Sequence, residues 1–387
     1  MTATPGITAA GISAGLKPSG ALDMALVAAP DLVSAAAVQT RNQVTAAPVQ
    51  ITARHVAKGK ARAVLLNAGS ANVCTGPDGI ATAERSAEIV AEGLGCATQE
   101  VLLCSTGVIG VAIPAGPFLG AIPRLVGELS EDGGGRAAKA IMTTDTRPKE
   151  AAVRVSDGTG TCVVGGMTKG SGMIAPEMAT MLCVLTTDAP VRGAVLRATL
   201  KDAVKRTFGR ISVDDCMSTN DAVIILATGT AAPPPSLPAF AEGLIAVCAQ
   251  LAEQLVRDGE GASKLVRIRV TGARVEAEAV GVARAIARSA LVRTAIAGED
   301  PNWGRIMAAM GAGPVQFDPN RVAITFGGVT VCRFGVAATF DRGQAAAALR
   351  GRDVTLTVDL GLGGDEATFL TCDLTHDYIP INAEYTT

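Results

Sequence analysis

Histidine is almost missing from this chain: only His55 and His376 occur among its 387 residues. A hydrolase of the serine–histidine–aspartate type would have to use one of them as its base. Aromatic residues are also scarce, at 3% of the chain, whereas hydrophobic residues make up 48% and there are 44 glycines. The interior is therefore expected to consist mainly of Ala, Val, Leu and Ile packed around tight turns, which is typical of a compact α/β enzyme.

The nine cysteines show no paired CxxC spacing, and their number is odd. Most of them lie inside apolar runs, as Cys104 does after Val-Leu-Leu. Reduced, buried thiols are therefore predicted. With two distant histidines and no metal-ligand spacing among the cysteines, the sequence predicts neither a structural zinc nor a catalytic metal.

Long runs of one charge or of apolar residues are also missing. The net charge is −2 with both signs mixed throughout, and no basic run with interleaved aromatic residues suggests a nucleic-acid surface. No stretch approaches the roughly 18 uninterrupted apolar residues of a membrane-spanning helix. The N-terminus lacks the basic and apolar regions of a signal peptide. We expect a soluble, cytoplasmic protein with no nucleic-acid or membrane partner.

The length exceeds the roughly 250–300 residues at which single cores stop growing, which predicts two lobes. Short apolar runs alternate with helical patterns, and this alternation predicts an α/β fold. Helices are expected at residues 82–94, 115–129, 136–142, 192–208, 238–257, 274–288 and 341–350. Strands are expected at residues 63–66, 101–104, 151–155, 161–164, 180–187, 221–227, 264–271, 321–325, 328–332, 354–359 and 366–372.

Four connections stand out between these elements. The strand at 101–104 is expected to end abruptly at Ser105-Thr106-Gly107, where a turn could expose backbone N–H groups to a ligand. A Gly/Asn/Ser-rich loop is expected from residue 67 to 79. Gly327-Gly328 predicts a hairpin turn, and the three prolines at 233–235 predict a rigid surface loop rather than a domain boundary.

The segment from Lys169 to Leu182 places a small residue, Ala179, directly before Thr180. Cleavage of the bond between them would give Thr180 a free α-amino group beside its own hydroxyl. With an unperturbed pKa of about 7.7–8.0, that amine suits proton transfer near neutral pH, so one residue would carry both nucleophile and base. The alternative is that Thr180 simply begins the strand expected at 180–187, and both interpretations can hold together.

The segment from Lys169 to Leu182 resembles the nucleophile motif of the ornithine acetyltransferase family, also called glutamate N-acetyltransferases. The resemblance extends over nearly the whole chain. Further stretches that carry it are Thr40-Arg41-Asn42, residues 67–72, 105–110 and 141–145, Ser218-Thr219-Asn220-Asp221, residues 258–261 and 300–305, and Asn382-Ala383-Glu384-Tyr385.

This resemblance implies a two-lobed, self-processing N-terminal-threonine acyltransferase fold. The precursor would cleave itself into an α chain of residues 1–179 and a β chain of residues 180–387, and two of each would form a heterotetramer. The enzyme would move the acetyl group of N2-acetyl-L-ornithine to L-glutamate through an acetyl-threonine intermediate in arginine biosynthesis, with ping-pong kinetics. No cofactor is implied. Acetyl-coenzyme A would be a second donor if the enzyme is bifunctional, which the sequence leaves open.

The resemblance also assigns site residues. Thr180 would be the nucleophile, and Thr106 and Gly107 would form the oxyanion hole for the tetrahedral intermediate. We expect Lys169 to bind a substrate carboxylate and Glu260 to bind the ornithine ammonium, although each could also be an ordinary solvated charge. The positions that match the family's substrate-binding residues are Thr143, Lys169, Thr180, Glu260, Asn382 and Thr387.

One stretch departs from the family. Where many relatives read Val-Asp-Gly-Asp-Thr-Ser-Thr-Asn-Asp, this chain has Cys216 and Met217 in place of the second aspartate and its following threonine, after Asp215. The departure weakens inference about the range of acceptors. Two rival functions stay open: an aminopeptidase or amidase of the same self-cleaving architecture, in which water accepts the acyl group, and a silent relative that is never processed.

Overall fold

The computed structural model describes residues 1–175 and 181–384, and the chain forms two compact units. Of the described residues, unit 1 contains those from Met1 to Gly209 and from Cys216 to Leu255, and unit 2 contains Arg210–Asp215 and residues 256–384. The expectation of two lobes is therefore confirmed. The division at 179/180 concerns a single peptide bond that lies outside the described residues, and it stays a prediction.

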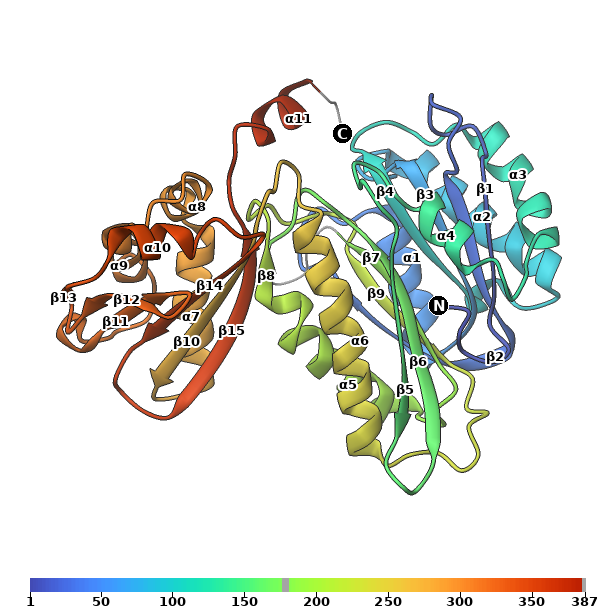
Figure 1. Cartoon of the computed structure of the whole chain (residues 1–387). Coiled ribbons are helices and arrows are strands. Elements are labelled where there is room, and N and C mark those ends of the chain that lie inside the picture. Colours follow the sequence, from blue (N-terminus) through green and yellow to red (C-terminus); the bar gives the residue numbers. More distant parts are fainter. Residues whose placement is uncertain (176–180, 385–387) are drawn as a thin grey trace. The chain divides into compact units, whose positions relative to one another are not determined.

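Unit 1 is built on one large sheet of eight strands (Figure 1). Its order is β4-β3-β2-β9-β7-β6-β5, and β1 pairs with β2. Neighbouring strands are antiparallel except for the parallel pairs β3–β4 and β7–β9. The strands are β1 (Thr8–Ile12), β2 (Met24–Gln39), β3 (Lys60–Ser70), β4 (Val101–Val108), β5 (Lys149–Ser156), β6 (Thr161–Lys169), β7 (Leu182–Thr187) and β9 (Ala222–Ala227).

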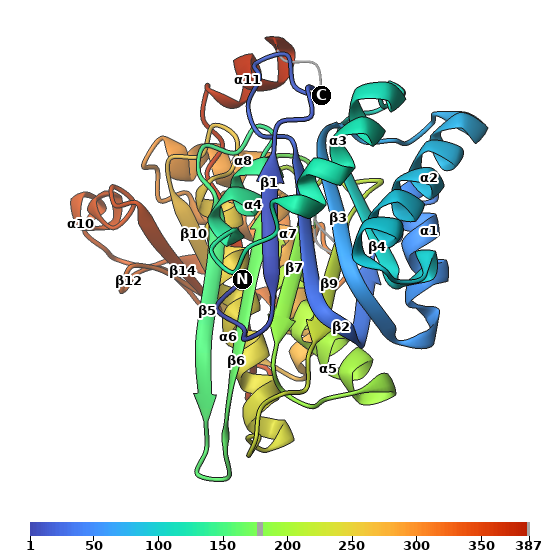
Figure 2. The same ribbon diagram turned by 90° about the vertical axis from the view of Figure 1, so that its right-hand side faces the viewer.

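Helices cover both faces of this sheet (Figure 2). The helices α1 (Ala47–His55), α2 (Gly76–Leu94) and α3 (Ala115–Gly127) share a core with β1 to β4. Side chains on the other face of these strands join those of β6, β7 and β9, together with α4 (Gly134–Ala140), in a second core. The helix α6 (Leu237–Arg257) packs on β6 from the side opposite to this second core, where Gly166 lies beside Leu251, and α5 (Gly193–Arg206) packs on β2.

The helix α6 is long and apolar enough to cross a membrane by composition alone. Its side chains Phe240, Leu244, Val247 and Leu251 are nevertheless fully or almost fully buried within unit 1. A Cβ atom on Gly166 of β6 would come within 3.1 Å of Leu251, so the helix packs directly on the sheet. We conclude that α6 is a core helix. The proline stretch at 233–235 precedes it inside unit 1 and is no boundary between units, as predicted.

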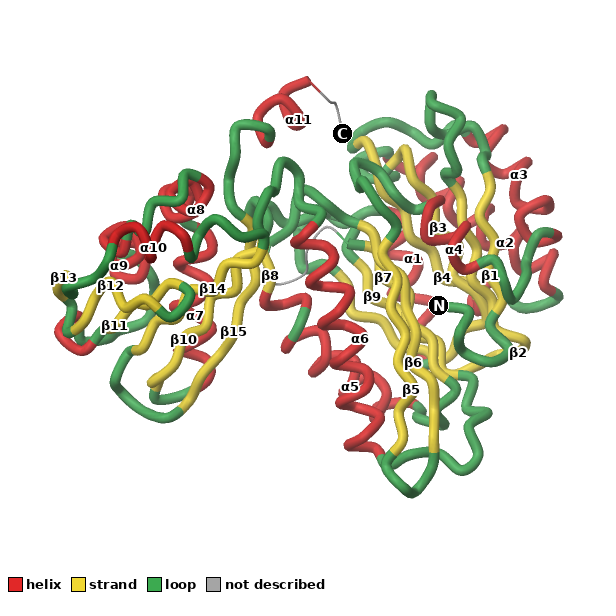
Figure 3. The backbone as a smooth tube through the Cα atoms, viewed as in Figure 1, coloured by secondary structure: helices red, strands yellow, loops and turns green. Residues whose placement is uncertain are grey.

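Unit 2 has its own sheet and core (Figure 3). The sheet order is β13-β12-β11-β14-β10-β15-β8. Its strands are β8 (Ile211–Ser212), β10 (Leu265–Ala273), β11 (Ala323–Phe326), β12 (Val329–Arg333), β13 (Val336–Ala337), β14 (Asp353–Asp359) and β15 (Asp365–Cys372). The helices are α7 (Glu276–Arg288), which packs on β10 and β15, α8 (Ala290–Ala297), α9 (Trp303–Gly311), α10 (Arg342–Ala347) and α11 (Tyr378–Glu384).

The hairpin predicted at Gly327-Gly328 is confirmed. Strands β11 and β12 are antiparallel, and the two glycines between them have φ of 50° and 93°. Positive φ at both central residues is what the favoured two-residue hairpin turn requires, and glycine adopts it without steric cost.

Several sequence-based boundaries were wrong. The strand expected to stop at residue 104 continues to Val108, and the expected loop from 67 to 79 begins only after Ser70 because β3 continues to that residue. Both extensions come from the parallel pairing of β3 with β4, which a single strand's pattern does not reveal. The alanine-rich strands β1 and β2 were missed because small residues carry little of the β-branched pattern that marks a strand.

The helix α1 covers the open edge of the large sheet. The hydroxyl of Thr52 donates a hydrogen bond to the backbone oxygen of Leu103 at 2.8 Å and accepts one from its N–H at 2.7 Å. A ring nitrogen of His55 lies 2.7 Å from the backbone oxygen of Val101. Because β4 is the edge strand, these side chains satisfy backbone groups that have no neighbouring strand. They also fix the strand that carries Thr106 and Gly107.

Replacing Thr52 by valine should test this edge contact. The valine has nearly the same shape, but it leaves both polar groups of Leu103 buried without a partner, at a cost of about 1–3 kcal/mol in the free energy of unfolding. Urea denaturation measures the change. Thr52→Ser keeps the hydroxyl and should lose less, and a valine variant as stable as the unmodified protein would show that the edge does not need this contact.

Candidate active site

The ends of β3 and β4 approach each other closely at two glycines. Gly107 has a φ of 128° and Gly69 a φ of 109°, and the two residues are partners in the strand pairing. A Cβ atom on Gly107 would lie 2.4 Å from the backbone carbon of Gly69, which no packing tolerates. Only glycine fits at residue 107, for both its backbone conformation and its space. The alternative of a simple turn here is wrong, because Thr106 and Gly107 belong to β4.

Three polar side chains hold this end of β4 in place. The hydroxyl of Ser105 donates to the side-chain oxygen of Asn67 at 2.6 Å. The amide of Asn220 donates to the backbone oxygens of Ser105, at 2.8 Å, and of Ala71, at 2.6 Å. All three side chains are buried. Ser105, the residue before Thr106, is therefore held through both its side chain and its backbone. A residue that forms part of an oxyanion hole needs a fixed position of this kind.

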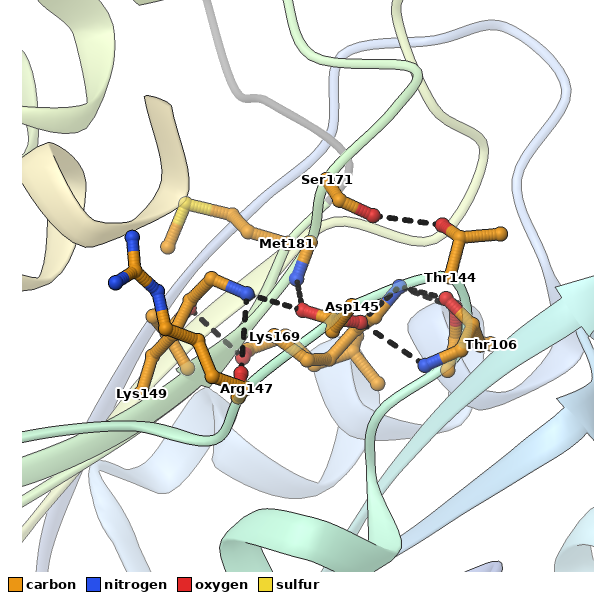
Figure 4. A network of polar contacts seen from close by, with 12 residues as sticks. Thr106, Thr144, Asp145, Arg147, Lys149, Lys169, Ser171 and Met181 are labelled. Carbon is orange, nitrogen blue, oxygen red and sulfur yellow. Dashed lines mark hydrogen bonds and ion pairs between the residues drawn. The ribbon is translucent and has the colours of Figure 1, made fainter. Parts of the chain in front are cut away.

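The ammonium group of Lys169 lies at the centre of the candidate site (Figure 4). Lys169 is the last residue of β6, and its side chain is only 3% exposed. It donates hydrogen bonds to the hydroxyl of Thr143 at 2.7 Å and to the hydroxyl of Thr106 at 3.3 Å. The alternative of a solvated surface charge is therefore wrong for Lys169. The structure brings Lys169, Thr143, Thr106 and Gly107 together.

A buried carboxylate, Asp145, organises this cluster. One of its oxygens accepts hydrogen bonds from the Lys149 ammonium at 2.6 Å and from the Gly170 N–H at 2.7 Å. The other accepts from the N–H of Thr143 at 2.9 Å and lies 4.0 Å from the Lys169 ammonium. Asp145 thus ties the loop before β5 to the end of β6. It also sets the position of Thr143 relative to Lys169.

The charges around Asp145 decide its ionisation. Burial alone would raise its pKa, but the ammonium groups of Lys169 and Lys149 and the hydrogen bond from Gly170 outweigh burial and lower the pKa from 3.8 to about 2. A carboxyl whose pKa is depressed on folding stabilises the fold above its unfolded pKa, and the stabilisation is lost as the pH falls through the folded value. The carboxylate is therefore ionised at neutral pH, with two buried ammonium groups beside it.

A second buried carboxyl, that of Asp221, lies directly before β9 in the sequence and beside the start of β7. One of its oxygens accepts a hydrogen bond from the N–H of Met181 at 3.0 Å. Met181 follows Thr180 in the sequence, so Asp221 contacts the peptide group directly after the predicted nucleophile. The Asp221 side chain is fully buried, and burial raises its pKa well above the usual value, although the hydrogen bonds from Met181 and Ser218 and the charge of Lys169 oppose this.

Unit 2 contains two further predicted residues. The amide of Asn382 in α11 donates to the carboxylate of Glu260 at 3.0 Å and to the backbone oxygen of Tyr378 at 3.1 Å. Glu260 is half-buried, in the turn before β10. A Cβ atom on the next residue, Gly261, would lie 2.5 Å from the backbone nitrogen of Tyr378, so the turn packs closely against the start of α11.

The remaining predicted residues, Ala179, Thr180 and Thr387, lie outside the described residues. The structure therefore shows two groups: Thr106, Gly107, Thr143 and Lys169 in unit 1, and Glu260 with Asn382 in unit 2. Their roles stay predictions.

Sequence reasoning gave no role to Asp145, Lys149, Asn220 or Asp221. Three of the four lie inside stretches that carry the family resemblance. Beyond that, a single polar residue beside a strand has no spacing that marks it. The contacts of Asp145 with Gly170, of Asp221 with Met181 and of Asn220 with Ser105 also join residues that are far apart in the sequence.

The cysteines take no part in this cluster. All nine are free thiols, and six of them are buried. Burial raises the pKa of the Cys104 thiol to about 12 and that of Cys183 well above its usual value. A thiol in this state is protonated and a poor nucleophile at neutral pH. Among the described residues, no group of His, Cys, Asp and Glu side chains could hold a metal ion.

Comparison with known proteins identifies the family. A model of the ArgJ family matches residues 8–387. The chain belongs to the ArgJ family. Proteins named arginine biosynthesis bifunctional protein ArgJ from Mycobacterium tuberculosis H37Rv and from Symbiobacterium thermophilum are each 46% identical to it. These alignments cover 100% of this chain and 96% and 98% of the two relatives.

A crystal structure of the ArgJ protein from Bacillus halodurans is 38% identical, with a TM-score of 0.50. It covers 52% of this chain and 97% of the solved chain. The ArgJ fold that the sequence motifs implied is therefore confirmed.

Replacing Asp145 by asparagine should destabilise the protein strongly. Two buried ammonium groups would lose their nearby carboxylate, and breaking a buried ion pair in this way costs about 3–5 kcal/mol. Denaturant unfolding near neutral pH measures the loss. The double variant Asp145→Asn/Lys149→Met removes one charge of each sign, so it should be more stable than the sum of the single losses predicts. Additive losses would contradict the ion pair.

Proposed function

We propose that this protein is a self-cleaving acetyltransferase of arginine biosynthesis that moves the acetyl group of N2-acetyl-L-ornithine to L-glutamate. The observation that carries this proposal is the buried Lys169 ammonium, which contacts the hydroxyls of Thr106 and Thr143 beside Gly107 in a chain that belongs to the ArgJ family. A buried cation beside neutral hydrogen-bond donors suits a substrate that carries a carboxylate and an amide carbonyl.

Self-cleavage comes first. The hydroxyl oxygen of Thr180 attacks the carbonyl carbon of Ala179, the peptide bond breaks, and an ester to the threonine oxygen forms while the nitrogen gains a proton. Water then hydrolyses the ester and leaves Thr180 with a free α-amino group. The crystal chain from Bacillus halodurans supports this step, because it aligns over 97% of its own length yet covers 52% of the present chain.

Acetyl transfer uses the same oxygen. Thr180 attacks the acetyl carbonyl of acetylornithine, and the negative charge on the carbonyl oxygen is stabilised by the Thr106 hydroxyl and the Gly107 N–H. Removal of one such donor typically costs about 2.7–4 kcal/mol of barrier. The C–N bond then breaks, the ornithine amine takes up a proton and leaves, and acetyl-Thr180 remains. The amine of glutamate attacks this ester, which restores the hydroxyl.

The α-amino group of Thr180 serves as the base, which removes the need for a histidine. The acetyl group passes through the enzyme's own hydroxyl, so no bound cofactor is required. We assign Lys169 and Thr143 to a substrate carboxylate. Glu260 and Asn382, with Thr387, are assigned to the ornithine side chain, whose ammonium suits a carboxylate partner.

The proposal extends to the assembly. After cleavage, α chains of residues 1–179 and β chains of residues 180–387 remain together as a heterotetramer in the cytoplasm. The relatives that carry the word bifunctional in their names support acetyl-coenzyme A as a second acetyl donor to glutamate.

Intact mass and acetyl transfer on one sample test the proposal. We expect two fragments of 179 and 208 residues in place of a 39.0 kDa chain, together with transfer from acetylornithine to glutamate. Thr180→Ala should abolish both, because one hydroxyl is the nucleophile in each step. A variant that still cleaves at 179/180 would exclude Thr180 as that nucleophile. Acetyl release to water without glutamate would instead support the hydrolase.

Deleting residues 385–387 tests the C-terminal assignment. Loss of Thr387 should lower turnover of acetylornithine without changing the thermal unfolding midpoint, because Thr387 is assigned to the substrate and not to the fold. The unmodified protein and a variant that keeps Thr387 but has alanine at residues 385 and 386 are the controls. Unchanged kcat/KM after the deletion would remove these positions from the substrate site.

A further inference from the structure

We infer that Asp221 is a positioning residue that places the Thr180 nucleophile by holding the peptide group of the next residue, Met181. The inference rests on the proposed function, since it concerns the placement of that nucleophile. The predicted role of Thr180 as nucleophile does not by itself imply this role for Asp221. The inference follows from the hydrogen bonds of the Met181 backbone.

Both polar backbone groups of Met181 are held by one short segment. Its N–H donates to the Asp221 carboxyl at 3.0 Å, and its carbonyl oxygen accepts from the N–H of Ala222 at 3.1 Å. The parallel pairing of β7 with β9 begins one residue later, where Leu182 faces Ala222. The Asp221 side chain therefore takes the place of a backbone partner and extends the pairing by one residue toward Thr180.

The Asp221 segment is itself fixed. The backbone oxygen of Asp221 accepts from the N–H of Thr40 at 3.0 Å, and the Thr40 hydroxyl donates to the backbone oxygen of Ser218 at 2.6 Å. Asn220, the residue before Asp221, holds the end of β4 through Ser105. One buried stretch, residues 218–221, therefore holds both the residue after the nucleophile and the strand that carries the oxyanion hole.

The second carboxyl oxygen of Asp221 is buried and has no hydrogen-bond partner among the described residues. Such a group costs free energy, and its retention needs an explanation other than stability. Among the described residues, no cation forms an ion pair with the Asp221 carboxyl. Its burial therefore favours the neutral form. A neutral carboxyl and a carboxamide have the same shape, and both offer a carbonyl oxygen to the Met181 N–H.

This equivalence defines the experiment. Asp221→Asn should keep self-cleavage and keep kcat for acetyl transfer within about threefold of the unmodified protein, whereas Asp221→Val should lower kcat about tenfold or more with KM changed less than about twofold. Intact mass at timed intervals follows cleavage. Steady-state transfer from acetylornithine to glutamate gives kcat and KM.

The matched control is Asp188→Val, at the opposite end of β7 from Met181. Asp188 follows β7, is buried, and accepts a hydrogen bond from the N–H of Val163 at 2.7 Å. Its loss should lower the unfolding midpoint as Asp221→Val does, with kcat within about threefold of the unmodified protein. A fall in kcat that is equal in the two valine variants would show a merely structural role and overturn the inference.

Two further results keep the test decisive. If Asp221→Val does not fold, Asp221→Glu replaces it, because the longer side chain keeps the acceptor but displaces it; glutamate activity equal to that of the unmodified protein would then overturn the inference. Loss of activity in Asp221→Asn as complete as in Asp221→Val would overturn it as well. Absence of cleavage and transfer in the unmodified protein would instead refute the proposed function, whatever the variants do.

Discussion

The candidate site depends on one buried carboxylate that serves two lysines. Asp145 bonds the Lys149 ammonium, the Gly170 N–H and the Thr143 N–H, and its charge faces Lys169. Without it, the Lys149 ammonium and the N–H groups of Gly170 and Thr143 would each lose a hydrogen-bond partner in the interior of unit 1. The stability of unit 1 and the arrangement of Thr143 beside Lys169 therefore depend on the same carboxylate.

Much of the fold could be predicted from the sequence, for physical reasons. Helices such as α3 and α6 carry a clear apolar stripe, and strands such as β9, with its run Ala-Val-Ile-Ile-Leu-Ala, are continuously apolar because they are buried. The glycine pair at 327 and 328 marked its hairpin. In contrast, β1 and β2 consist largely of alanine and other small residues, so that only their place in the sheet defines them.

The site was predicted less completely. The resemblance pointed to Lys169, Thr143, Thr106 and Gly107, and the structure brings these four together, but their roles in turnover await experiment. Asp145 and Asp221 received no role, since their importance lies in what they contact: a lysine or a peptide group on another strand. Contacts of this kind follow from strand order, and no local pattern encodes the order β2-β9-β7-β6.

That strand order has a consequence for a protein cut before Thr180. The strands β7 and β9 would belong to the β chain, yet they lie between β2 and β6, which would belong to the α chain. Each fragment would thus supply strands that complete the other's sheet, and the backbone pairing on both sides would remain after the bond is broken. The two products could not be exchanged or replaced without unfolding the whole sheet. Each pair of chains would keep the partner with which it was synthesised for the lifetime of the enzyme.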